Sequence, residues 1–592
     1  MGLMQKALET YQQHTDRVGV YYEGKTVLAP VSHAVKLTRI EVTIQDDGEF
    51  LAASVSEQKV LIPVTMESAG RTSKKAATIP HPLSDKLSYY IQQRELVMQQ
   101  LKRWADSPYG HSKIDAILAY LERGTLVEDL LRCGCIKMGK KGLSHTDWVV
   151  RWRVHGAGEE SACWKDQSLF RAFAQYYQST LADAATDLCM ITGETDVIAE
   201  MHPKGILAQQ ANAKLISSND TTNFTYRGRF TEERQAATIG YQASQKAHNA
   251  LTWLAAEQGV VWGDRTFLCW NPKGITVPSP TMGLLGPDEP TGNPIDYQRL
   301  LKKTLEGYWT RLPEQEDVII AVFDAATSGR LAVTYYNELR GSDFLQRLYH
   351  WDRQCCWYNW NFGVQSPLLH RIVNCAYGTQ REGTKKGEKV ITLETDDKLM
   401  RQQVQRLLAC RVDQVAVPRE LVDMLVNRAS MPQSFEERIW KEILFTACAM
   451  VNLKIQETGG ENVMSWTLDT KDRDFQYGRL LAVYEKAERD TYDKDETREP
   501  NAMRLMTMYR KRPYETMAIL EEQLVRAYLP KLSPQIREYY KRCMDEIMLC
   551  LTECEGYEGK QMNEPLKPIY LHGYHLQRME LYKKKNQEEE QK

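Results

Sequence analysis

Alternation of apolar and polar residues predicts β-strands in the first part of the chain. Residues 25–65 contain four short runs that are rich in Val, Ile and Thr, the residue types that strands favour. Asp46, Asp47 and Gly48 lie between two of these runs and have the composition of a tight hairpin turn. Further strands are predicted at 147–155, at 266–271 and within 317–339, where Ser328 and Gly329 form the turn.

A helical period of apolar residues dominates the remainder. It begins at 3–16, returns after Ser84 or Asp85, which are candidate helix caps, and continues through 111–135. A loop rich in Pro and Gly is predicted at 275–300. From about residue 395 onward almost every window fits a helix, and 477–592 is predicted to form a helical bundle.

These elements predict an α+β fold, with a mixed α/β N-terminal body followed by an all-helical C-terminal bundle. The expected domains are an α+β domain at 1–360, a mostly helical connecting region at 361–463 and the bundle at 464–592.

Composition narrows the class of protein. The formal net charge is −2, so a nucleic-acid-binding surface has to be local or shared with partners. The thirteen cysteines are scattered without a CxxC pair, which favours free thiols in a reducing cytosol over a zinc site. There is no run of about 18 apolar residues, and the segment after Lys6 lacks the apolar stretch of a signal peptide.

Catalytic patterns are missing from the sequence. It contains no phosphate-binding G-x-x-x-x-G-K-[ST] loop, no H-E-x-x-H helix and no G-x-S-x-G elbow. His81, His202 and His248 are isolated, without a second histidine three or four residues away. No acidic cluster suited to a two-metal nuclease is visible. The chain is therefore predicted not to be an enzyme, and no cofactor is expected.

The segment 67–90 is a candidate for binding a nucleic-acid backbone. Between Glu67 and Asp85 it has cations, hydroxyls and small residues but no acid, and these are donors that phosphate oxygens accept. An ordinary solvated surface loop is the alternative. The candidate DNA-binding residues here are Arg71, Thr72, Ser73, Lys74 and Lys75.

A second basic region lies in the predicted bundle. Between Arg504 and Arg542 there are nine Arg or Lys residues against four Glu, with tyrosines interleaved. Cations with aromatic rings suit a groove for single-stranded DNA, whereas a solvated helix face is the alternative. The candidate contacts are Arg510, Lys511, Arg512, Arg537 and Lys541.

Several ordered motifs resemble the large subunit of type I-C CRISPR surveillance complexes (Cascade), the Csd-type family. The opening order is PVSHAV, IEVTIQDDGEF, IPVTMESAGRTSKK and IPHPLSDKL, and the closing helix GYxxQRxxLY begins at Gly573. The central motif is CMITG at 189–193, then IAEMHPK at 198–204 and LISSN at 215–219, where the family usually has Phe in place of Ser218. The resemblance extends from residue 3 to about 585.

The resemblance gives the central motif two interpretations. In the functional one, side chains of the motif bind the duplex or the guide RNA, because Lys and Asn suit the acceptors of the minor groove. In the structural one, Gly193 closes a turn, Pro203 stiffens a loop and Asn219 adopts a left-handed turn. The candidate DNA-binding residues of this segment are Lys204, Lys214, Ser217 and Asn219.

As a whole, the resemblance implies a non-catalytic, cytoplasmic subunit that reads the motif flanking the target, helps to open the duplex and holds the displaced strand. It implies as partners the crRNA, double-stranded and displaced single-stranded target DNA, the backbone and crRNA-processing subunits, small helical subunits and a helicase–nuclease. It also suggests Met464 as an internal translation start for a small helical subunit. The alternatives are a nuclease or nucleotide-dependent enzyme of an unfamiliar type and a purely structural scaffold.

Overall fold

The computed structural model describes residues 2–71, 79–140, 142–217, 230–285, 292–385, 388–493 and 495–589. Helices make up 49% and strands 18%, with helices toward the C-terminus, so the predicted α+β class is confirmed. The chain divides into two compact units, which are Met1–Val277 with Glu316–Leu339 and Pro278–Gln315 with Arg340–Lys592. The predicted domain boundaries near 360 and 463 both lie within the second unit.

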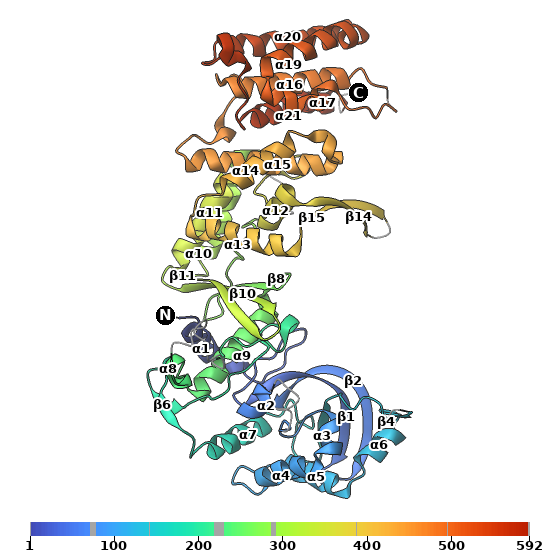
Figure 1. The fold of residues 1–592 in the computed structure, drawn as a ribbon, viewed down its shortest axis with the longest axis vertical. Helices are drawn as coiled ribbons and strands as arrows, with labels where there is room; N and C mark the ends of the chain where they lie inside the picture. Colours follow the sequence, from blue (N-terminus) through green and yellow to red (C-terminus); the bar gives the residue numbers. More distant parts are fainter. Residues whose placement is uncertain are drawn as a thin grey trace. The chain divides into compact units, whose positions relative to one another are not determined.

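A three-stranded sheet organises the first half of unit 1. Strands β1 (His33–Gln45) and β2 (Phe50–Pro63) form a long antiparallel hairpin, so the four predicted runs merge into two strands (Figure 1). The predicted turn at Asp46 to Gly48 is confirmed, and Gly48 has a φ of +79°, a value that L side chains rarely adopt. Strand β5 (Val150–His155), also predicted, pairs with β1 in parallel.

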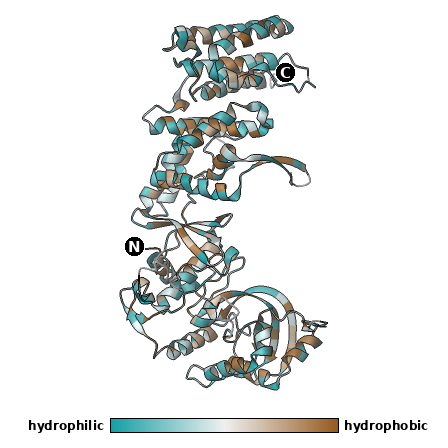
Figure 2. Cartoon of the chain, viewed as in Figure 1, coloured by the Kyte–Doolittle hydropathy of each residue, from teal (hydrophilic) through white to brown (hydrophobic). Residues whose placement is uncertain are grey.

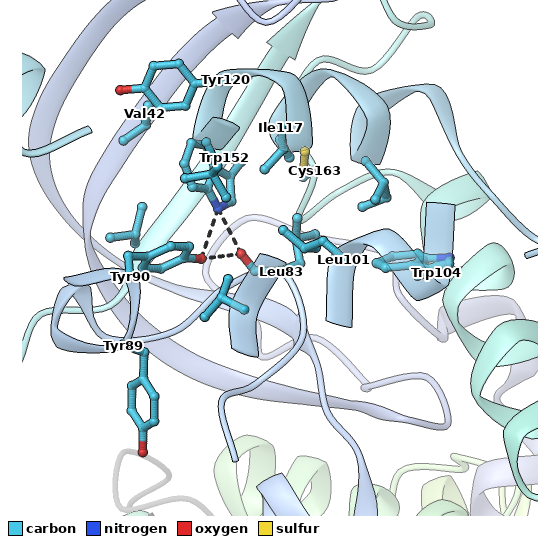
Figure 3. Close-up of a cluster of buried hydrophobic side chains, with 14 of the residues drawn as sticks. Val42, Leu83, Tyr89, Tyr90, Leu101, Trp104, Ile117, Tyr120, Trp152 and Cys163 are labelled. Carbon is cyan, nitrogen blue, oxygen red and sulfur yellow. Dashed lines mark hydrogen bonds between the residues drawn. The ribbon is translucent and has the colours of Figure 1, made fainter. Parts of the chain in front are cut away.

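A hydrophobic core lies between this sheet and the helices beside it. At its centre the indole N–H of Trp152 donates to the carbonyl of Leu83 at 2.8 Å (Figure 3). The hydroxyl of Tyr90 donates to the same carbonyl. Leu83 has a φ of +67°, and its two hydrogen bonds hold this strained turn in place. Tyr89 and Tyr90 both belong to this buried cluster, and Figure 3 shows their rings pointing in different directions.

The helix predicted after Ser84 or Asp85 is present, but the structure differs from the prediction in two respects. It is broken at Gln93 into α3 (Leu87–Gln92) and α4 (Arg94–Ala105), and Lys86 is the N-cap residue of α3. The prediction that Ser84 or Asp85 caps it is wrong, because Lys86 separates both from the first turn and the carboxylate of Asp85 has other partners.

The other elements in this part of unit 1 are α2 (Met66–Gly70), α5 (Ser112–Arg123), α6 (Leu126–Arg132), β3 (Met138–Gly139), β4 (Gly142–Leu143), α7 (Gln167–Thr180), β6 (Thr186–Leu188), β7 (Thr195–Val197) and α8 (Glu233–Ala236).

A second sheet, in the order β11-β10-β9-β8, packs on two helices in unit 1. The turn at Ser328 and Gly329 joins β10 to β11, as predicted. The buried Lys6 of the first helix forms ion pairs with Glu9 at 2.8 Å and with Asp317 at 2.7 Å, which ties the N-terminus to this sheet. These elements are α1 (Leu3–Gln13), α9 (Tyr241–Gln258), β8 (Val260–Trp262), β9 (Arg265–Trp270), β10 (Asp317–Thr327) and β11 (Arg330–Arg340).

Unit 2 begins with helices and two hairpins. The loop predicted at 275–300 ends early, because Asn293 caps a helix that has Pro294 in its first turn. The helices are α10 (Pro294–Trp309), α11 (Gly341–Gln354), α12 (Leu369–Tyr377), α13 (Asp397–Asp413), α14 (Arg419–Ala429) and α15 (Glu437–Glu457). The hairpin strands are β12 (Trp357–Asn359) with β13 (Gly363–Gln365), and β14 (Thr379–Lys385) with β15 (Glu388–Glu394).

The predicted C-terminal bundle surrounds the buried helix α16. A Cβ atom on Gly573 would lie 2.0 Å from the carbonyl oxygen of Phe475, so glycine allows α16 and α21 to approach closely. The closing GYxxQR signature is therefore buried in the bundle, where Gln577 accepts a hydrogen bond from Arg479 at 2.9 Å. The helices are α16 (Arg473–Arg489), α17 (Asn501–Arg504), α18 (Met506–Lys511), α19 (Pro513–Gln523), α20 (Pro534–Thr552) and α21 (Tyr570–Glu589).

No helix within the described residues is long and apolar enough to span a bilayer. Hydrophilic residues recur along the long helices, as the colouring in Figure 2 shows. All thirteen cysteines fall in the described ranges and are free thiols, mostly buried.

Candidate nucleic-acid interface

An ion pair joins the two ends of the candidate loop in segment 67–90. The guanidinium of Arg71 donates to both carboxylate oxygens of Asp85 at 2.8 Å and to the carbonyl of Ile79 at 2.7 Å. Its guanidinium carbon also lies 4.8 Å from the ring centroid of Tyr89. Arg71 thus connects the residue that precedes 72–78 with the residue that follows it.

The carboxylate of Asp85 is the centre of this arrangement. Besides Arg71, it accepts the backbone N–H of His81 at 2.6 Å and that of Lys86 at 2.8 Å. The side chain of Asp85 is 2% exposed and that of Arg71 is 14% exposed. Arg71 is therefore committed to the local structure of the loop, and its contact with DNA stays a prediction. Thr72, Ser73, Lys74 and Lys75 lie outside the described residues.

The central motif begins as a tight hairpin between β6 and β7. Cys189 and Glu194 close it with a backbone hydrogen bond of 2.8 Å, and Gly193 has a φ of +75°. The thiol of Cys189 is fully buried and accepts the backbone N–H of Gly240 at 3.2 Å. The CxxTG pattern is thus a turn anchored to the start of α9, in agreement with the structural interpretation of Gly193.

The HPK segment is anchored to α9 and to the candidate loop. His202 Nδ1 lies 2.8 Å from the hydroxyl oxygen of Ser244, a fully buried residue of α9. Two residues further on, Lys204 Nζ donates to the backbone carbonyl of Arg71 and to the side-chain oxygen of Asn212 at 3.1 Å. The structure therefore brings together two segments that the sequence separates by about 130 positions, since Arg71 and Lys204 are 133 residues apart.

Lys214 lies beside Lys204, because the two residues form an antiparallel β-bridge. The backbone of Lys214 also joins the turn between β10 and β11, where its carbonyl accepts the N–H of Leu331 at 2.9 Å. Ser217 is exposed at the end of this described segment, and Asn219 lies outside it.

Four cations consequently gather at the base of the candidate loop, and we call Lys36, Arg71, Lys204 and Lys214 the cation cluster. Burial, together with the charges of Lys36, Lys214 and Arg71, lowers the pKa of Lys204 to about 8. Burial also lowers the pKa of Lys36, and the charge of Arg71 adds to this effect. The pKa of His81 is held well below its usual range by burial and by these neighbours, so its ring is neutral.

Sequence reasoning missed Lys36, which lies on β1 among apolar neighbours and looks like an ordinary strand residue. Among the described residues its ammonium has no ion pair, and Asp85, the nearby carboxylate, is occupied by Arg71. Partly buried cations that repel one another bind an anion favourably, because the anion relieves both the burial cost and the repulsion. The signal in the sequence is a lysine that interrupts the strand HAVKL.

One arrangement resembles a hydrolase pair but lacks access. Ser244 Oγ lies between His202 and His248, at 2.8 Å and 3.5 Å from their Nδ1 atoms. Burial lowers the pKa of His202 to about 3 and that of His248 to about 4. Because Ser244 and His248 are fully buried, no substrate reaches this hydroxyl.

The predicted residues of the C-terminal bundle have different roles. Arg537 donates to the carbonyls of Leu529, Pro530 and Leu532 at 2.9–3.1 Å, so it closes the turn before α20. Arg510 bonds the side chain of Asn427 at 2.6 Å. Exposed positions on this surface are Lys511, Arg512 and Lys541, and Arg512 lies 3.6 Å from Glu515.

The described residues thus combine an α+β fold with a cluster of partly buried cations. Residues 8–582 match the family model described as CRISPR-associated protein, Cas_Csd1. The chain therefore belongs to the Csd1 family of CRISPR-associated proteins, which confirms the resemblance of its motifs to that family. Membership of this family supports the prediction that the chain is a subunit of a Cascade-type CRISPR complex. No curated protein sequence matches the chain.

Proposed function

We propose that this protein is the non-catalytic large subunit of a type I-C RNA-guided surveillance complex. In this proposal the crRNA reads the target by base pairing, and unit 1 reads the short flanking duplex motif. The subunit then helps to open the duplex, and unit 2 stabilises the displaced strand through exposed cations such as Lys511 and Lys541. It also provides a docking surface for the helicase–nuclease.

The cation cluster is the observation that carries this proposal. Lys36 and the neighbouring pair Lys204 and Lys214 come from two distant parts of the sequence, and they meet at Arg71, which precedes the Lys-rich segment 72–78. Asp85 does not neutralise the lysines of the cation cluster, because its carboxylate is paired with Arg71. A phosphodiester backbone would supply the missing negative charge. The location of Lys74 and Lys75 in the same loop adds two further donors by sequence alone.

The non-catalytic part of the proposal rests on the sequence, which contains none of the catalytic patterns named above. Within the described ranges, no group of three or more His, Cys, Asp or Glu side chains is arranged to hold a metal ion. The contact of Ser244 with His202 and His248 is buried, so this hydroxyl offers no nucleophile to a substrate. A nuclease of unfamiliar type is the competing function, and incubation of the purified complex with target DNA and Mg²⁺ distinguishes the two.

The test is the salt dependence of duplex binding by the assembled complex. Each phosphate contact that is lost reduces the slope of log K against log salt by about one unit. We expect K36Q and K214Q each to flatten the slope by about one unit and K74Q/K75Q by about two. K102Q is the matched control, because Lys102 is an exposed lysine of α4 in the same unit.

An unchanged slope in all three variants, with normal assembly of the complex, refutes the assignment of this surface. A purely structural scaffold predicts that result. Equal flattening by K102Q indicates a diffuse charge effect and also contradicts a specific site at the cation cluster.

A further inference from the structure

Unit 2 contains a cavity of about 780 Å³ that none of the roles above explains. It lies between the β12–β13 hairpin, the start of α12 and the first half of α15. The volume falls within the range of about 300–1,000 Å³ that is typical of ligand pockets. A single nucleobase or a short peptide side-chain cluster fits such a space.

The charges on the cavity walls are already neutralised. Glu442 pairs with Arg371 at 3.1 Å, and Glu437 pairs with Lys441 at 2.8 Å. Asp352, deeper in the wall, pairs with the buried Arg411 at 2.9 Å. The other two charged lining residues, Glu436 and Arg438, lie 4.0 Å from each other. With its charges paired in this way, the cavity has no charged group reserved for a phosphate or a carboxylate. Its preferred ligand is therefore neutral.

The β12–β13 turn presents an aromatic ring at the mouth. Phe362 is 45% exposed, although a phenyl ring normally packs in a core. The turn is held in shape, because the side chain of Asn359 accepts the backbone N–H of Asn361 at 2.9 Å. Trp360, which also lines the cavity, is fixed by the guanidinium of Arg578 at 4.9 Å from its ring centroid.

Two amide groups line the same cavity. Among the described residues, the side chains of Asn361 and Gln365 have no hydrogen bond, so both have donors and acceptors available. An amide matches the mixed donor and acceptor edge of a nucleobase, and an exposed aromatic ring stacks on its face. Neutral walls, an exposed ring and free amides together are the groups that recognise an unstacked base.

We propose that this cavity binds one unstacked nucleobase of a single-stranded nucleic acid, stacked on Phe362 and bonded by Asn361 and Gln365. This proposal rests on the proposed function, because only a protein that handles opened nucleic acid meets such a base. It extends that function from backbone binding to capture of a base. A protein segment as occupant is the alternative outcome of the test.

Photocrosslinking of the full-length protein tests the proposal. A short single-stranded DNA carrying one 5-iodouracil is irradiated with the protein, and the adduct is mapped by mass spectrometry. We expect adducts in the peptide that contains Trp360 and Phe362. F362L keeps an apolar side chain but removes the ring, so we expect the yield of this adduct to fall about tenfold. An oligonucleotide abasic at the same position is expected to compete poorly.

The matched control is W309L, since Trp309 is a 42% exposed ring on α10 that does not line the cavity. Its adduct yield stays at the wild-type level if the site is specific. The proposal is overturned if adducts map elsewhere, if F362L leaves the yield unchanged, or if the abasic strand competes equally. Failure of the duplex salt-slope test leaves this readout unaffected, because the assay uses no duplex and no residue of the cation cluster.

Discussion

Replacement of Asp85 by Asn tests whether the Arg71–Asp85 ion pair organises the candidate loop. Asp85 accepts hydrogen bonds from both arms of Arg71 and from the backbone of His81 and Lys86. An amide keeps the size of the carboxylate but has one acceptor oxygen, and its NH₂ group faces a donor. The substitution therefore removes the negative charge and leaves the guanidinium without its partner.

The expected magnitude follows from burial. Asp85 is 2% exposed and Arg71 is 14% exposed, so solvent compensates the lost charge poorly. Removing one partner of a buried pair costs about 3–5 kcal/mol, and the lower value applies because Arg71 is partly exposed and keeps its bond to Ile79. We expect the free energy of local opening around 64–90 to fall by about 3 kcal/mol.

Hydrogen exchange followed by mass spectrometry measures this change locally. A loss of about 3 kcal/mol corresponds to exchange that is about a hundredfold faster in peptides covering 64–90. D115N is the control, because Asp115 is an exposed carboxylate on α5 without an ion pair among the described residues. If D85N exchanges within about threefold of wild type, the ion pair does not hold the loop and the reasoning fails.

Three further predictions concern charge, packing and the C-terminal surface. The pKa of Lys204 is lowered from 10.5 to about 8, so the affinity for duplex DNA should fall as the pH rises through 8 and Lys204 loses its charge. Above pH 8 the unfolded chain binds more protons at this lysine than the folded chain, so the stability of unit 1 should rise with pH. K204R should abolish the change in affinity, because arginine keeps its charge. G573A should destabilise the bundle by about 3 kcal/mol in thermal unfolding, whereas G307A, with open space around its Cβ, should be neutral or stabilising. R537Q should speed hydrogen exchange at 529–540 by about tenfold, because the contacts of Arg537 with backbone carbonyls are lost. K541Q should leave hydrogen exchange unchanged and flatten the salt slope for binding of single-stranded DNA by about 0.7. The opposite pattern in either pair contradicts the roles assigned here.

Local patterns predicted many elements because local physics determines them. The turn at Asp46 to Gly48 forms where a positive φ requires glycine, and the alternation on either side gives β1 and β2. The period of apolar residues likewise placed α1 close to its observed bounds. The predicted cap at Asp85 failed because a distant guanidinium and two backbone N–H groups compete for that carboxylate.

The candidate site was only partly predictable for the same reason. Lys204 and Lys214 were named from a motif, and the charged loop was named from its composition. Nothing in the sequence alone indicated that the ammonium of Lys204 bonds the carbonyl of Arg71, or that Lys36 joins them. Arg537 is a basic residue by sequence, whereas the structure uses it to close a turn.

The sequence by itself determined the α+β class, the strands and helices set by period, and the family to which the chain belongs. These depend on residue type and spacing along one segment. Only the tertiary structure decided which cations lie close together and which are neutralised by ion pairs such as Arg71–Asp85. It also decided that the β12–β13 turn places Phe362 at the cavity of unit 2. Burial and pairing arise between segments far apart in the chain, and they determine whether a charge or a ring remains available to a ligand.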